Sequence, residues 1–65
     1  MEFFDMIKSQ YGSLQACAKK LGTNKEQLMR QINTGDARVL HAIADHSRLS
    51  RQEVRWEFRY YKENT

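Results

Sequence analysis

The side chains that most often carry out chemistry in proteins are few in this chain of 65 residues, and they are not spaced for it. Cys17, His41 and His46 are the candidate soft metal ligands, but no CxxC or HxxxH pair exists, so a zinc site is not expected. The chain has no glycine-rich phosphate loop and no nucleophile motif around a serine. We therefore predict that the protein is not an enzyme and uses no cofactor, metal or small-molecule substrate.

Length and charge favour a small domain with a polyanionic partner. A chain of this length builds one domain at most, with a thin core and marginal stability. Its net charge of +3 and its pI of about 9.3 mildly favour nucleic acid. A single cysteine excludes an internal disulfide, which fits a reducing compartment. The opening stretch MEFFDMIKSQ is too charged for a signal peptide, and no apolar run is long enough to cross a bilayer.

The stretch LQACAKKLGTNKEQLMRQI, residues 14–32, predicts two short helices joined by a sharp corner at Gly22. Within a single helix this glycine would cost about 1 kcal/mol relative to alanine, whereas at a corner it can adopt the positive φ required. The second helix has two possible start signals, Asn24 with Gln27 or Thr23 with Glu26. The residues expected to point inward at helical spacing are Leu14, Cys17, Ala18, Leu21, Leu28 and Ile32.

Three further segments carry helical signals. The first covers residues 2–11 and stops at Gly12, and another is expected to begin at Asp36. The last has the clearest start, a capping box formed by Ser50 and Glu53. The inward residues expected in these segments are Phe3, Phe4, Ile7, Tyr11, Val39, Leu40, Ile43, Ala44, Val54, Phe58 and Tyr61.

These patterns predict an all-α fold class, a compact bundle of about five short helices. No segment alternates with period two for long, so strands are not expected. We place a single domain at residues 1–62 and a frayed C-terminus at residues 63–65. The pattern leaves open whether residues 36–62 form two helices or one bent element.

The small residue Ala18 followed four positions later by Gly22, with apolar residues on both sides, is the pattern of a helix-turn-helix. Thr23 stands where a buried aliphatic residue is common in that motif. The stretches YGSLQACAKKLG and TNKEQLMRQINTG, the preceding EFFDMIKSQ and the later LSRQEVRWEF resemble the Cro repressors of lambdoid phages and the related YdaS-like antitoxin or repressor domains. The resemblance implies a lambda-repressor-like fold and a phage or prophage regulator that binds double-stranded operator DNA in the bacterial cytoplasm, at the nucleoid, often as a dimer.

In a helix-turn-helix, the N-terminal residues of the second helix meet base edges in the major groove. Here that helix covers residues 24–34, and its candidate base contacts are Lys25, Glu26, Gln27, Met29 and Arg30. The candidate contacts to the DNA backbone are Ser13, Gln15, Lys19, Asn33 and Arg38. Other roles compete: Glu26 as a cap, Met29 as core and Lys19 as a solvated face. Arg30 is the best base-contact candidate because it points almost opposite Leu28 and Ile32.

The last helix raises a separate question, because Trp56 and Tyr60 project away from its inward face. Either they form a homodimer contact, or Trp56 packs against the first helix and completes the core. A basic stripe on the same helix either touches DNA, pairs with glutamates of the helix or keeps it soluble; its members are Arg51, Arg55, Arg59 and Lys62. The alternative function is a small helical adaptor that binds another protein through its aromatic last helix.

Overall fold

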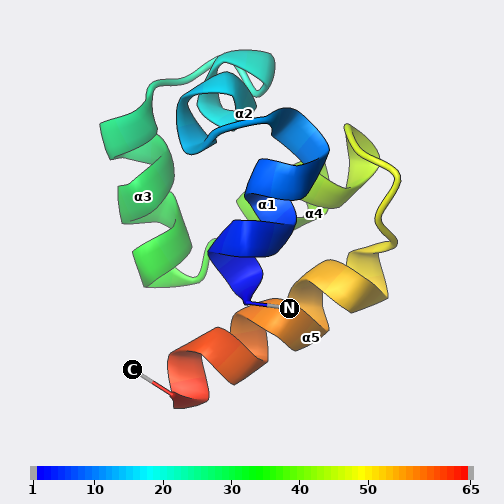
Figure 1. Cartoon of the computed structure of the whole chain (residues 1–65). Helices are drawn as coiled ribbons and strands as arrows, with labels where there is room; N and C mark the ends of the chain where they lie inside the picture. The colour runs from blue at the N-terminus through cyan, green and yellow to red at the C-terminus, as the bar shows by residue number, and fades with distance from the viewer. Residues whose placement is uncertain (1, 65) are drawn as a thin grey trace.

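Five α-helices make up the computed structural model, which describes residues 2–64 (Figure 1). They are α1 Phe3–Tyr11, α2 Leu14–Lys20, α3 Lys25–Thr34, α4 Ala37–Asp45 and α5 Arg51–Glu63. No strand occurs within residues 2–64, so the predicted all-α fold class is confirmed. The open question after residue 36 is also answered, because α4 and α5 are separate helices.

The C-terminal segment predicted to fray, residues 63–65, starts with the last residue of helix α5. Helix α5 continues to Glu63, and Asn64 follows as its C-cap. The side-chain amide of Asn64 donates to the carbonyl oxygen of Tyr60 over 2.8 Å. Thr65 lies outside the described residues, and the domain boundary at residue 62 stays a prediction.

The core is a single cluster of apolar side chains, and the described residues include no buried polar or charged one. Each residue expected to point inward is buried in this cluster or partly buried against it. Met6 is buried as well, although the sequence pattern did not single it out. Helix α1 packs against both α2 and α5, so it buries a wider stripe than the face of Phe3 and Ile7 alone. All five helices contribute buried side chains to this one core.

The corner between α2 and α3 is formed by two backbone hydrogen bonds. The amide of Thr23 donates to the carbonyl of Ala18 over 2.9 Å, and the amide of Gly22 donates to that of Lys19 over 3.1 Å. This pair of bonds is a Schellman motif, which requires a left-handed residue after the helix. Gly22 supplies it with a φ of +77°. After this corner, the chain continues as α3 in a different direction from α2 (Figure 1).

Asn24, rather than Thr23, is the N-cap of α3. Its side-chain oxygen Oδ1 accepts a hydrogen bond from the amide of Gln27 over 2.8 Å. The start signal formed by Asn24 and Gln27 is therefore the one that operates. Glu26 is left without the capping-box role and lies exposed in the first turn, where the helix dipole favours a carboxylate.

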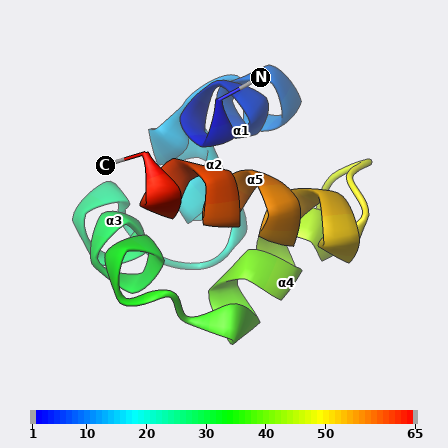
Figure 2. The ribbon, with the colours of Figure 1, turned by 90° about the horizontal axis from the view of Figure 1, so that it is seen from below.

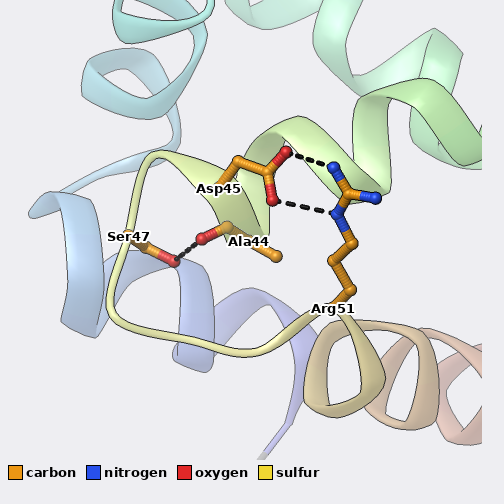
Figure 3. Close-up of polar contacts among 4 residues, drawn as sticks. All are labelled: Ala44, Asp45, Ser47 and Arg51. Carbon is orange, nitrogen blue, oxygen red and sulfur yellow. Dashed lines mark hydrogen bonds and ion pairs between the residues drawn. The ribbon is translucent and has the colours of Figure 1, made fainter.

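The junction between α4 and α5 is joined by polar contacts (Figure 3). Arg51 donates from Nε and Nη2 to the two carboxylate oxygens of Asp45 over 3.0 and 2.7 Å. These hydrogen bonds hold the pKa of Asp45 below its usual value. The predicted capping box of Ser50 and Glu53 is present and starts α5. The ion pair is exposed, so it orients the junction more than it stabilises the fold.

Replacing Gly22 with alanine tests the corner. Nothing lies within 4 Å of the position that a Cβ would take there, so the cost comes from the left-handed backbone alone. We expect Gly22→Ala to lower the free energy of unfolding by about 1 kcal/mol, measured by urea denaturation. Gly22→Asn should lose less, because asparagine tolerates this conformation better. Equal stability of Gly22→Ala and the wild type would contradict the role given to this residue.

Candidate nucleic-acid interface

Helix α3 presents one side to the core and leaves the other open. Leu28 and Ile32 are fully buried, and the main neighbours of the helix are α2 and α4. Figures 1 and 2 show α3 at one edge of the molecule, where none of the other four helices covers its outer side. The residues exposed on this helix include Lys25, Glu26, Gln27, Arg30 and Asn33, and Met29 is half-buried.

Two shallow hollows on this side meet at the start of α3. One runs along the helix and is lined by Lys25, Glu26, Met29, Arg30, Asn33 and Thr34. The other lies at the corner and is lined by Gln15, Lys19, Thr23, Asn24, Lys25 and Glu26. Because Lys25 and Glu26 line both, the hollows form one continuous surface, which we call the α3 face.

Most candidate DNA contacts lie on the α3 face. Four of the five base-contact candidates line it, and so do three of the five backbone candidates, Gln15, Lys19 and Asn33. The fifth base-contact candidate, Gln27, is exposed on α3 but lines neither hollow. The tertiary structure thus brings residues of α2 beside residues of α3, while their contact with DNA stays a prediction.

Two backbone candidates lie elsewhere and already have partners within the chain. The hydroxyl of Ser13 accepts a hydrogen bond from the amide of Ala16 over 3.0 Å, as the N-cap of α2. Arg38 lies on α4, and its Nε is 3.5 Å from a carboxylate oxygen of Asp36. These two residues are not part of the α3 face.

The cations of the α3 face are not neutralised by the protein itself. Within residues 2–64, neither Lys19, Lys25 nor Arg30 forms an ion pair. One carboxylate, that of Glu26, lines the two hollows beside these three cations. The α3 face is therefore positive, and its charges are available to an anionic partner.

Met29 contributes an apolar surface to the same face. It lines the hollow along α3 and is half-buried, between core and solvent. A flexible thioether in this position can contact an apolar group such as the methyl of thymine. The α3 face therefore offers both charge and apolar contact.

The aromatic residues of α5 form a second exposed feature. Trp56 is 73% exposed and Tyr60 is 63% exposed, and they are the exposed large hydrophobic residues in the described part of the chain. Trp56 does not complete the core, because it lies nearly opposite the face through which Val54 and Phe58 pack. This outcome removes the core alternative and leaves an exposed aromatic surface.

The sequence offered Cys17, His41 and His46 as candidate metal ligands. Among residues 2–64, no group of three or more histidine, cysteine, aspartate or glutamate side chains could hold a metal ion. Cys17 is buried in the core, and burial raises the pKa of its thiol to about 11. No helix in the described part of the chain has the length and apolar character needed to cross a membrane.

Comparison with protein-family models, with curated proteins and with solved structures finds no match for the chain.

The buried thiol leads to a pH-dependence prediction. The folded thiol stays protonated up to a pKa of about 11, against an ordinary value of 9.0 for an accessible one. The stability contributed by burying the neutral thiol is fully present below pH 9.0 and is lost as the pH rises to about 11. In urea titrations across this window, the free energy of unfolding should fall more steeply for the wild type than for Cys17→Ala. Parallel slopes for the two proteins would contradict the prediction.

Proposed function

We propose that the protein is a sequence-specific double-stranded DNA-binding transcriptional regulator that places α3 in the major groove. The observation that carries this proposal is the α3 face, an outward surface of α3 and the adjoining α2 whose three cations have no ion-pair partner within the described residues. The major groove is about 12 Å wide and admits one α-helix. A helix held at the edge of a small domain fits that requirement.

The connection of α2 to α3 supports the same proposal. A short helix, a left-handed glycine and a second helix with a free outer side are the components of a helix-turn-helix. With α3 in the groove, Gln15 and Lys19 of α2 lie beside its start and face the neighbouring phosphates.

The α3 side chains suit the edges of bases. Arg30 or Lys25 can donate to O6 and N7 of guanine, and Glu26 can accept from N4 of cytosine. Gln27 remains a candidate for adenine, and Met29 suits the thymine methyl. Contacts of these kinds make binding depend on sequence as well as on charge.

Among such regulators, we infer a phage or prophage repressor of the Cro type. The stretches YGSLQACAKKLG and TNKEQLMRQINTG, which resemble those proteins, form α2, the corner and α3 here. The five helices of residues 2–64, among which no strand occurs, agree with the all-helical members of that group, as the resemblance implies.

A homodimer is part of the proposal and is supported by the exposure of Trp56 and Tyr60. Large aromatic side chains are enriched in protein–protein interfaces, where their burial contributes most of the binding energy. A two-fold contact through α5 would present two α3 helices to half-sites one turn of DNA apart.

The second candidate function is a helical adaptor that binds a different protein through the same aromatic surface. It is favoured by the exposure of Trp56 and Tyr60, and by the carboxylate of Glu26 on the α3 face. The two functions differ in their response to salt, since phosphate contacts release counterions and an apolar protein contact does not. Absence of any salt-sensitive DNA binding would favour the adaptor.

Substitution of Arg30 tests the DNA-binding proposal directly. Selection of bound sequences from random DNA first identifies a preferred site. On that site, Arg30→Ala should weaken binding by about 1–3 kcal/mol and relax the preference at one base pair, because a bidentate contact to a base is lost. Fluorescence anisotropy of a labelled duplex measures both effects.

The matched control is Arg48→Ala. Arg48 is exposed in the loop between α4 and α5. Figures 1 and 2 show this loop on the side of the molecule away from α3. The Arg48→Ala substitution removes the same charge as Arg30→Ala, so a comparison of the two variants separates the loss of a local contact from the change in net charge. Equal weakening by both substitutions would argue against an α3 contact, and failure of the wild type to bind DNA would overturn the proposed function.

Substitution of Trp56 tests the homodimer. We expect the wild type to sediment as a concentration-dependent dimer and Trp56→Ala to sediment as a monomer, because the substitution removes the largest exposed apolar side chain of the described residues. We expect this variant to fold as the wild type does, since Trp56 is outside the core. A wild-type monomer at high concentration would remove the dimer from the proposal.

A further inference from the structure

A basic hollow lies next to the α3 face and belongs to α5 and α4. Three arginines line it, Arg51, Arg55 and Arg59, and the rest of its lining is Gly35, Ala37, Leu40, Gln52, Trp56 and Phe58. The α3 face ends at Asn33 and Thr34, and the next residue along the chain, Gly35, already lines the basic hollow. The two surfaces therefore adjoin at the end of α3.

The fold holds the arginine side of α5 in this place. The ammonium group of Lys62 donates to the carbonyl oxygen of Asn33 over 3.3 Å, which joins the end of α5 to the end of α3. The ring of Phe58 lies 3.6 Å from the position that a Cβ would take at Gly35, so the helix packs directly beneath this turn. Arg51, Arg55 and Arg59 follow at four-residue spacing along one side of α5.

The charges of the hollow are only partly neutralised. No carboxylate lines it. Arg51 is paired with Asp45 (Figure 3), and Arg59 is 3.6 Å from a carboxylate oxygen of Glu63. Arg55 is exposed and has no acidic partner within residues 2–64. An exposed pair such as Arg59 with Glu63 is worth little, so phosphate can replace its carboxylate.

The size of the molecule explains why a second phosphate contact is needed. Its extents are 27 × 23 × 19 Å, whereas the major groove is about 12 Å wide. A domain that inserts α3 must therefore meet phosphates at both edges of the groove. Gln15 and Lys19 adjoin the start of α3, on the side of α2. The basic hollow adjoins its other end, toward α4 and α5 (Figure 2).

We propose that Arg55, with Arg59 beside it, contacts the phosphate backbone at the second edge of the groove that α3 enters. This inference rests on the proposed function, because the phosphates belong to the same duplex. It assigns a DNA-binding role to one part of the basic stripe of α5, the side of the helix on which Arg55 and Arg59 lie.

The test is the salt dependence of binding to a labelled mixed-sequence DNA duplex, measured by fluorescence anisotropy. Each phosphate contact contributes about 0.9 to the slope of log affinity against log salt. Arg55→Ala should lower the magnitude of the wild-type slope by about this amount, and Arg55→Lys should retain it. The control Arg48→Ala should leave the slope unchanged, although it removes the same charge.

The outcomes separate this inference from the proposed function. A wild-type slope in Arg55→Ala, alongside normal salt-sensitive binding by the unmodified protein, overturns the role of Arg55 alone. No DNA binding by the unmodified protein overturns both proposals. If Arg55→Ala instead changes the association state in sedimentation, Arg55 belongs to a contact between proteins, and the inference is overturned on that ground.

Discussion

The left-handed backbone at Gly22 is the constraint on which the rest of the molecule depends. It lets the amides of Gly22 and Thr23 satisfy carbonyls at the end of α2, which would otherwise lack partners. It also turns the chain so that Leu28 and Ile32 of α3 pack in the same core as the buried residues of α1 and α2. Because Leu28 and Ile32 hold one side of α3 in the core, the opposite side of the helix faces outward. A residue with a Cβ at this corner would strain the backbone, because the space around it is open and only its positive φ is unfavourable.

The thin core limits where function can reside. Its buried side chains are all apolar in the described residues, and its titratable member, the Cys17 thiol, is kept neutral by burial. The distinctive polar and charged groups of the described residues therefore lie on the surface. Two surface features stand out among the described helices, the positive α3 face and the exposed aromatic residues of α5.

Charge is distributed unevenly between cations that the chain neutralises and cations that it leaves available. Arg38, Arg51 and Arg59 have acidic partners, whereas Lys19, Lys25, Arg30 and Arg55 have none in the described part of the chain. Net charge alone does not reveal this distinction, since both groups count equally toward +3. A polyanion that approaches the end of α3 meets available positive charge on both sides of it.

Local signals in the sequence predicted most of the helices, but they left open whether residues 36–62 form two helices or one bent element. Glycines that end helices, side chains that cap them and apolar spacing act within a few residues, so the corner at Gly22, the capping box at Ser50 and the inward residues were all predictable. Competition between neighbouring caps was not, because Thr23 and Asn24 are equally suited and only the packed geometry selects Asn24. Tertiary packing alone decided that Met6 is buried, that Trp56 is exposed, that Gln15 and Lys19 lie beside Lys25, and that the arginines of α5 adjoin the end of α3. These are relations between segments distant in sequence, and they depend on how whole helices share one small core.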